Sequence, residues 1–290
     1  MNYRHAFHAG NFADVHKHAV LSRVLQYLCR KPAALRVIDT HAGAGRYDLF
    51  APEPTRSGEW REGIARLWQA PRWREGQGPQ ALLAPYLDAV AALNPDGELR
   101  TYPGSPLVAR HLLRPQDRLI ACEIEPRAAA SLAAALRGEA RAKVLVIDGW
   151  TALGAYVPPK ERRGLALIDP PFEQADELVR LNEALSRALR KWPRGVYLAW
   201  RPIREAAPDA RFLNGVAALG QPNILALEID VGPGKVGAHG QRPLARCGLL
   251  AVNPPHTLID EARLLLPWLA RLLERGGRGS QVCEWLTEPR

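Results

Sequence analysis

The stretch GLALIDPPF at residues 164–172 carries residue types that point to chemistry on an aromatic amine. Asp169 is expected to end a buried strand, and Pro170 and Pro171 fix the backbone after it. A carboxylate and a proline carbonyl held in this way can accept both hydrogens of an exocyclic amine such as that of adenine, which directs the nitrogen lone pair toward an electrophile. Phe172 adds a ring on which a base taken out of its helix can stack.

A second strand with a similar ending, LAVNPPH at residues 250–256, serves as a comparison. A strand followed by a proline turn explains both copies without a catalytic role. Asp169 is the stronger candidate because it follows the fourth expected strand and its prolines are followed by an aromatic residue. Asn253 lies late in the sheet and its prolines are followed by His256. We therefore expect Asp169 to be catalytic and the second copy to be structural.

A glycine-rich turn follows the first expected strand, LRVID. Gly43 and Gly45 come shortly after Asp39, and such a turn lets a ligand approach the backbone and the next helix closely. In a dinucleotide fold, an acid that binds ribose hydroxyls follows about 20 residues later. Here the next acid at a strand end is Glu123, and a helical insertion accounts for the longer interval. We therefore predict that Glu123 binds a ribose.

The third expected strand ends at Asp148 and Gly149, which would lie beside the adenine of a nucleoside cofactor, although Asp-Gly is often only a turn. The glycine-rich turn has no phosphate-binding lysine after it, which argues against a P-loop, and no full GxGxxG, which argues against a dinucleotide. S-adenosylmethionine needs a ribose-binding acid and an adenine site but no pyrophosphate cradle. It fits these residues better.

These candidates need a sheet that brings the strand ends together. Seven short apolar runs alternate with helical stretches, and most runs are continuous, as expected of strands buried on both faces of a parallel sheet. The pattern predicts an open, doubly wound α/β fold with a mostly parallel seven-stranded sheet. The expected strands lie at residues 35–39, 118–125, 142–148, 164–171, 195–200, 224–231 and 248–255.

Residues 50–100 interrupt this alternation with helical periodicity and no convincing strand. We interpret them as an inserted helical subdomain. Residues 1–49 and 101–290 then form one Rossmann-like domain that begins with an N-terminal arm.

The formal net charge of +9 favours a polyanionic partner such as nucleic acid, because Lys and Arg replace counterions on phosphates. The four cysteines are far apart and suggest neither a disulfide framework nor a zinc cluster. No apolar run approaches the roughly 18 residues of a membrane span, so we expect a cytoplasmic protein with no membrane partner.

Histidines are concentrated near the N-terminus, in YRHAFHAGNFADVHKH at residues 3–18. A metal-dependent hydrolase using these histidines is a distant alternative. Metal sites usually add carboxylates at fixed spacing, whereas only Asp14 is close here and the string matches no HExxH-type motif. We expect no metal.

The motifs DxHxGxG, EIEP, DG and DPPF, in this order, resemble those of S-adenosylmethionine-dependent N6-adenine methyltransferases. Longer strings are more specific, and they include YRHxFHAGNxADVxKH, GEWREGIARLW and YPGSPLVARxLLRxxD. Together they resemble the bacterial 23S rRNA adenine-N6 methyltransferase J family, from about Tyr3 to the C-terminal QVCEWL.

The resemblance implies a monomeric class I methyltransferase with an inserted helical subdomain. It implies methylation of one adenine of 23S rRNA, with S-adenosylhomocysteine as the product. Its motifs place Tyr3, His5 and Lys17 near substrate and catalysis, beside Asp169, Pro170 and Phe172. The family's usual DPPY is DPPF here, which preserves stacking and loses a hydroxyl. The cofactor-binding residues would be His18, His41, Gly43, Ser105, Glu123, Asp148, Gly149 and Asp169.

Two other functions remain open on the sequence. N6-methylation of adenine in DNA or in another RNA uses the same motifs, although the chain shows no target-recognition domain beyond the short insertion. A basic RNA-binding protein without catalysis is also possible, but it would not need an intact DPPF.

Overall fold

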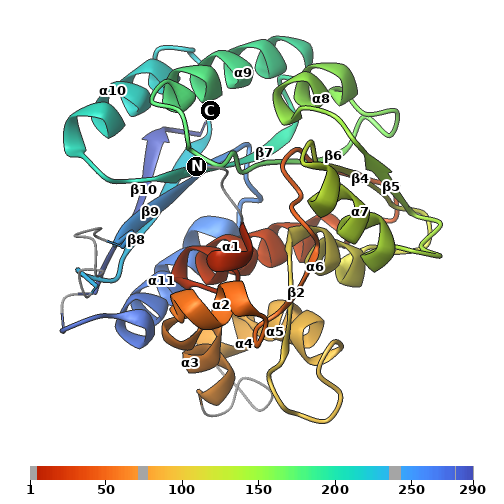
Figure 1. The fold of residues 1–290 in the computed structure, drawn as a ribbon. Coiled ribbons are helices and arrows are strands. Elements are labelled where there is room, and N and C mark those ends of the chain that lie inside the picture. The colour runs from red at the N-terminus through yellow and green to blue at the C-terminus, as the bar shows by residue number, and fades with distance from the viewer. Residues whose placement is uncertain (1–4, 71–77, 235–242, 278, 290) are drawn as a thin grey trace.

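A computed structural model describes residues 5–70, 78–234, 243–277 and 279–289. Its centre is an eight-stranded sheet in the order β10-β8-β9-β7-β6-β1-β4-β5, with helices on both faces (Figure 1). The strands are β1 Arg36–Asp39, β4 Arg118–Cys122, β5 Ala142–Leu145, β6 Gly164–Ile168, β7 Val196–Pro202, β8 Ile224–Asp230, β9 Arg246–Val252 and β10 Ser280–Thr287.

Strand direction decides where the strand ends lie. β1 runs parallel to β4 and β6, β4 to β5, and β6 to β7. β9 is antiparallel to both β7 and β8, and β10 is antiparallel to β8. The carboxyl ends of β5, β4, β1, β6 and β7 therefore share one edge of the sheet, called the carboxyl edge below.

The predicted fold class is confirmed, but the strand count of seven is wrong. The eighth strand, β10, is a half-buried edge strand rather than a continuous buried run, so it lacks the pattern that identified the others. A separate two-stranded sheet of β2 (Arg46–Asp48) and β3 (Thr101–Pro103) was also not expected, because three-residue strands leave little periodicity to detect.

Two helical layers cover the sheet, and β6 shows why its sequence is apolar throughout. Leu165 and Leu167 face the core under α1, whereas Ala166 and Ile168 face the core under α9. The first layer contains α1 (Phe12–Leu28), α6 (Ser105–Leu112) and α11 (Leu258–Leu273). The second contains α8 (Gly149–Tyr156), α9 (Glu177–Lys191) and α10 (Ala206–Ala217), while α7 (Pro126–Ala135) packs near β5.

The described part of residues 50–100 consists of helices joined by turns, with no strand. These are α2 (Pro52–Ser57), η2 (Glu59–Glu62), α3 (Ile64–Gln69), α4 (Pro79–Leu82) and α5 (Ala84–Ala91). All of these except α2 contribute to one apolar core with α1 and α11. β2 pairs with β3 where the segment leaves and rejoins the sheet domain. Its treatment as a separate subdomain remains an interpretation. None of the described helices is long and apolar enough to cross a membrane.

Helix α1 is buried on every side from Phe12 to Leu25, although it contains several polar residues. The Asn11 side chain caps its first turn by accepting from the backbone amides of Ala13 and Asp14, at 2.9 and 3.0 Å. A Cβ atom on Gly63 would overlap the backbone of Gly10 and Asn11, so the insertion packs directly on this helix start. The polar side chains of α1 therefore point into the protein.

A buried ion pair joins α10 to the far part of the sheet. The Arg201 guanidinium, which is fully buried, donates from Nε to Asp209 Oδ1 at 2.6 Å and from Nη2 to Glu228 Oε1 at 2.5 Å. Removing one partner of a buried pair leaves an uncompensated charge in the interior.

We predict that Asp209→Ala lowers the free energy of unfolding by about 3 kcal/mol, because Arg201 then keeps only one carboxylate partner. Urea denaturation would measure the change. The control is Glu183→Ala, which removes an exposed i,i+4 partner of Arg187 at 3.5 Å and should change stability by less than about 0.5 kcal/mol. Equal effects of the two substitutions would contradict the prediction.

Candidate active site

Four acidic residues line the carboxyl edge. Asp39 is the last residue of β1, Glu123 directly follows β4, Asp148 follows β5, and Asp169 directly follows β6. These strands are neighbours in the order β6-β1-β4-β5 and run parallel, so their carboxyl ends lie side by side. The sheet thereby assembles residues that are far apart in the sequence.

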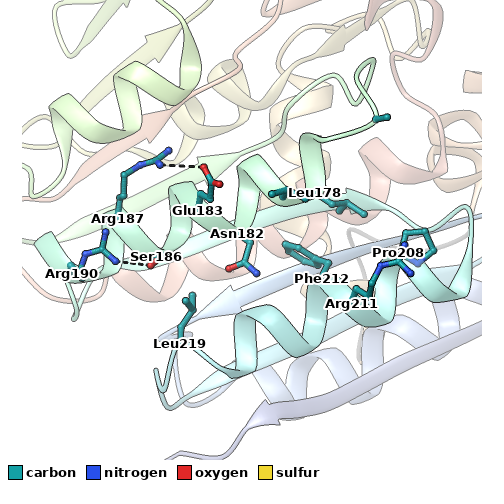
Figure 2. Close-up of a pocket in the computed structure, with 12 residues that line it drawn as sticks. Leu178, Asn182, Glu183, Ser186, Arg187, Arg190, Pro208, Arg211, Phe212 and Leu219 are labelled. Carbon is teal, nitrogen blue, oxygen red and sulfur yellow. Dashed lines mark hydrogen bonds and ion pairs between the residues drawn. The ribbon is translucent and has the colours of Figure 1, made fainter.

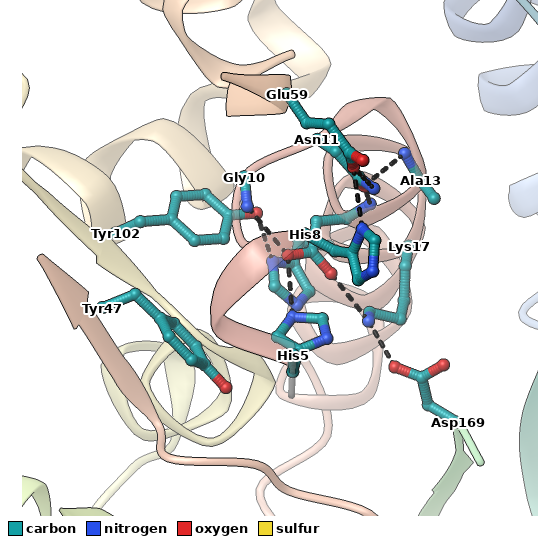
Figure 3. Close-up of polar contacts among 12 residues, drawn as sticks. His5, His8, Gly10, Asn11, Ala13, Lys17, Tyr47, Glu59, Tyr102 and Asp169 are labelled. Atoms are coloured by element: carbon teal, nitrogen blue, oxygen red, sulfur yellow. Dashed lines mark hydrogen bonds and ion pairs between the residues drawn. The ribbon is translucent and has the colours of Figure 1, made fainter. Parts of the chain in front are cut away.

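A chain of hydrogen bonds connects Asp169 to the N-terminal segment (Figure 3). The Lys17 ammonium donates to Asp169 Oδ2 and to Asp14 Oδ1, the latter at 2.8 Å. Asp14 Oδ2 lies 3.0 Å from His5 Nε2 and accepts from the Gly10 amide at 2.9 Å. The side chains of Lys17 and Asp14 are 5% and 2% exposed, whereas that of Asp169 is 14% exposed and faces the site.

The charges in this chain stabilise one another. Burial alone lowers the pKa of Lys17, but Asp14 and Asp169 outweigh it and hold the pKa of Lys17 well above its usual value. Burial would raise the pKa of Asp14, but His5 and Lys17 hold it well below the usual range. Lys17 is therefore an ammonium and Asp14 a carboxylate at neutral pH.

Asp39 has a different environment. It is 1% exposed, and neither carboxyl oxygen has a hydrogen-bond partner of good geometry among the residues that the structure describes. Burial, reinforced by the charge of Asp169, raises the pKa of Asp39 to about 7, while Ser105 and Lys17 act in the opposite direction. Asp39 therefore binds a proton far more readily than an ordinary aspartate.

The glycine-rich turn is fastened to the end of β4. Glu123 accepts from the Gly43 amide at 2.9 Å and from the Glu125 amide at 2.8 Å, and Gly43 adopts a φ of 61° that favours glycine. A Cβ atom on Gly43 would also overlap the Tyr47 hydroxyl. Glu123 thus orders the turn that it faces.

Asp148 and Gly149 form the start of α8. Asp148 caps the helix by accepting from the Thr151 amide at 2.8 Å. A Cβ atom on Gly149 would overlap the Thr40 carbonyl and the His41 ring, so glycine permits the close approach of α8 to the end of β1. Burial lowers the pKa of His41 to about 4, which keeps its imidazole neutral.

His18 and Ser105 reach the site from the first helical layer. His18 is 1% exposed, its Nδ1 lies 2.8 Å from the Tyr102 hydroxyl, and its Nε2 has no partner within the described ranges. Burial lowers the pKa of His18 to about 3, so its imidazole is neutral. Ser105 is buried at the first position of α6, directly after the β2–β3 sheet.

The DPPF segment ends in a constrained aromatic residue. Phe172 has a φ of 51°, which lies in the left-handed region, and its ring meets that of Trp200 edge-on with centroids 5.6 Å apart. Trp200, near the end of β7, was not identified from the sequence. Because Trp200 lies in an apolar strand, the sequence did not indicate that it contacts Phe172.

The second proline motif lies at the opposite edge of the sheet. β9 is antiparallel to β7, so Val252 pairs with Tyr197 near the beginning of that strand. Asn253 donates to the carbonyls of Pro193 and Gly195 at 2.9 and 2.7 Å and accepts from Gln221 at 3.0 Å. These bonds give Asn253 a structural role.

The N-terminal histidines have separate partners. His5 contacts Asp14, His8 contacts Glu59 at 3.0 Å, His16 lies 3.6 Å from the Cys247 sulfur, and His18 contacts Tyr102. Across the described segments, no three His, Cys, Asp or Glu side chains form a group that could hold a metal. The metal-dependent hydrolase hypothesis has no support.

The structure thus brings together most of the predicted site residues, but Tyr3 lies outside the residues that it describes. Sequence reasoning treated Asp14 only as a possible metal ligand and missed it as the partner of Lys17. Their i,i+3 spacing on a helix was a signal for this contact.

A separate surface groove of about 570 Å³ lies between α9 and α10 (Figure 2). It has apolar residues such as Leu178 and Phe212 and arginines such as Arg187 and Arg211 along its walls. None of the predicted site residues lines it, so the candidate active site is elsewhere.

Comparison with known proteins matches the whole chain. The family model described as ribosomal RNA large subunit methyltransferase D, RlmJ, covers residues 32–287. Ribosomal RNA large subunit methyltransferase J of Escherichia coli is 38% identical over 286 residues, or 99% of both chains. The Haemophilus influenzae protein of the same name is 38% identical over 288 residues, again 99% of both chains.

The fold agrees with these matches. A crystal structure of a Legionella pneumophila protein superimposes with a TM-score of 0.85 at 33% identity, covering 96% of this chain and 98% of that one. The resemblance inferred from the motifs is confirmed. The chain belongs to the ribosomal RNA large subunit methyltransferase J (RlmJ) family.

Proposed function

We propose that this protein transfers the methyl group of S-adenosylmethionine to N6 of one adenine in 23S rRNA. The observation that carries the proposal is the position of Asp169, a partly exposed carboxylate at the carboxyl edge that is held by Lys17 and followed by Pro170, Pro171 and Phe172. Membership in a family of large-subunit rRNA methyltransferases supports the choice of substrate, as does the net charge of +9.

The residues at the carboxyl edge fit this cofactor. Among the predicted cofactor-binding residues and their neighbours in the described structure, the Asp39 carboxyl and His18 Nε2 are buried and lack hydrogen-bond partners. Leaving such a group unpaired costs about 1–3 kcal/mol, so a ligand with polar groups of its own is favoured there. Glu123 would bind the ribose and Asp148 with Gly149 the adenine, while His18, His41, Gly43 and Ser105 would hold the remainder. Bound S-adenosylmethionine supplies an electrophilic methyl group on a sulfonium.

Asp169 then acts on the target amine. Its carboxylate and the Pro170 carbonyl would accept hydrogen bonds from the two N–H groups of adenine N6, which directs the nitrogen lone pair toward the methyl group. The new N–C bond would form as the S–C bond of the methyl donor breaks. Nitrogen loses one proton, and Asp169 accepts it and passes it to water. Lys17 donates a hydrogen bond to Asp169 Oδ2 and so fixes the orientation of this carboxylate.

Phe172 contributes a stacking surface for the base. Its contact with Trp200 orients the ring, so substitution of the family's usual tyrosine leaves this role intact. A second product, N6-methyladenine in DNA, has no feature of the structure in its favour and becomes an outcome of the test.

We predict that the purified protein, given S-adenosylmethionine with a labelled methyl group, modifies deproteinised 23S rRNA from cells that lack this methyltransferase. Nuclease digestion and mass spectrometry should identify one N6-methyladenosine per rRNA molecule, because a single flipped adenine fits the site. Labelling of duplex DNA alone, or of no nucleic acid, would contradict the proposed function.

We predict that Asp169→Asn lowers kcat by at least about 100-fold, because the amide keeps the shape of the side chain and cannot take the proton. Single-turnover methylation of rRNA would measure the loss. The matched control is Asp176→Asn, an exposed acid in the same segment, which should retain wild-type turnover. Comparable activity of the two variants would exclude Asp169 as the acceptor.

A further inference from the structure

We propose that Asp14 is a positioning residue for methyl transfer: its carboxylate holds the Lys17 ammonium against Asp169 and links this pair to the N-terminal segment through His5. The inference rests on the proposed function, since it gives Asp14 a role in preparing Asp169.

Asp14 uses both carboxylate oxygens for this purpose. Oδ1 accepts from Lys17 Nζ at 2.8 Å, while Oδ2 lies 3.0 Å from His5 Nε2 and accepts from the Gly10 amide at 2.9 Å. The residue is 2% exposed. A carboxylate that is removed from water and surrounded by donors is fixed in one orientation, and it fixes its partners in turn.

Lys17 needs such a second anchor. Its side chain is long and flexible, and a contact with Asp169 alone would leave the ammonium free to follow that carboxylate or to leave it. Because Asp14 is on the same buried helix as Lys17, it holds the ammonium at the end of β6 before a substrate binds. Asp169 then keeps one oxygen on Lys17 and has the other available for the adenine amine.

Asp14 also contacts the segment that precedes α1. His5 begins the short helix η1 (His5–Phe7), its ring lies 5.3 Å from that of Tyr47, and the Phe7 carbonyl accepts from the Ser57 hydroxyl of the insertion. Asp14 is therefore the carboxylate that connects this segment to Lys17, through its contact with His5.

Acidic and basic groups both surround Lys17, and the loss of Asp14 removes one of the two carboxylates that stabilise its ammonium form. With Asp14, two carboxylates face one ammonium; without it, a buried ammonium keeps only Asp169 and its protonated form is less stable. The titratable groups around Asp14 and Lys17 come from several elements: His18 of α1, His5 of η1, His8 after η1, Asp39 of β1, Tyr47 of β2, Tyr86 of α5, Tyr102 of β3, Asp169 after β6 and Cys247 of β9.

The test compares Asp14→Asn with Glu59→Gln. Glu59 is a matched control because it also fastens the N-terminal segment, through His8 at 3.0 Å and Asn11 at 2.9 Å, but does not contact Lys17. We expect Asp14→Asn to lower kcat by about 10- to 100-fold with a smaller change in KM for rRNA, because a displaced ammonium misplaces Asp169. Glu59→Gln should keep kcat within about threefold of the wild-type value.

The alkaline limb of the pH–rate profile is a second readout. Lys17 loses its proton as the pH rises through its pKa, and removal of Asp14 lowers that pKa, so the limb should move to lower pH in Asp14→Asn. Glu59→Gln should leave the limb where it is. A purely structural role of Asp14 would lower activity without this movement.

A third readout needs neither cofactor nor rRNA. NMR of protein with ¹³C-labelled lysine, with Lys17 assigned through a Lys17→Arg variant, should show Lys17 titrating at lower pH in Asp14→Asn than in wild type. Unchanged titration and wild-type kcat in a folded Asp14→Asn protein would overturn the inference while wild-type methylation still stands. If Asp14→Asn does not fold, Asp14→Glu replaces it: we expect lower kcat with Lys17 still titrating high, and wild-type kcat would overturn the inference.

Discussion

A cation shared between a buried carboxylate, Asp14, and a partly exposed one, Asp169, ties the first helix to the end of β6. Lys17 can occupy this place only because α1 is buried on every side, so that its polar residues face the interior instead of water. Close packing of the insertion at Gly10 and Gly63 keeps the start of the helix in position. The apolar core thus serves to place one charged contact at the carboxyl edge.

Strand direction gives the same local motif two different meanings. Asp169 and Asn253 both end a buried strand and precede two prolines, but β6 is parallel to β1 and β9 is antiparallel to β7. Asp169 therefore lies with the other strand-terminal acids, whereas Asn253 lies at the opposite edge and bonds to neighbouring carbonyls. A motif becomes a site through the sheet that carries it.

The parts of the fold with strong periodicity could be predicted from the sequence. Continuous apolar runs identified the parallel strands, and their terminal acids followed, because parallel strands must end at one edge. Contacts between distant segments could not be predicted in this way. The family resemblance placed Lys17 and Asp169 in one site, but no local periodicity pairs them, and Phe172 gives no sign of Trp200. Such pairings depend on how α1 and β7 pack, which local pattern does not encode. The edge strand β10 was not predicted because it is only half-buried and lacks a continuous apolar run.

The burial of α1 also orders events during synthesis. The side chains of this helix contact partners 152 to 238 residues later in the sequence: Lys17 contacts Asp169, His16 contacts Cys247 and Arg23 contacts Glu261. Until the segments that carry these partners have been made, these polar groups of α1 lack those native contacts. The contact between Lys17 and Asp169 can therefore form only after β6 has been synthesised, and the contacts of His16 and Arg23 require still later segments.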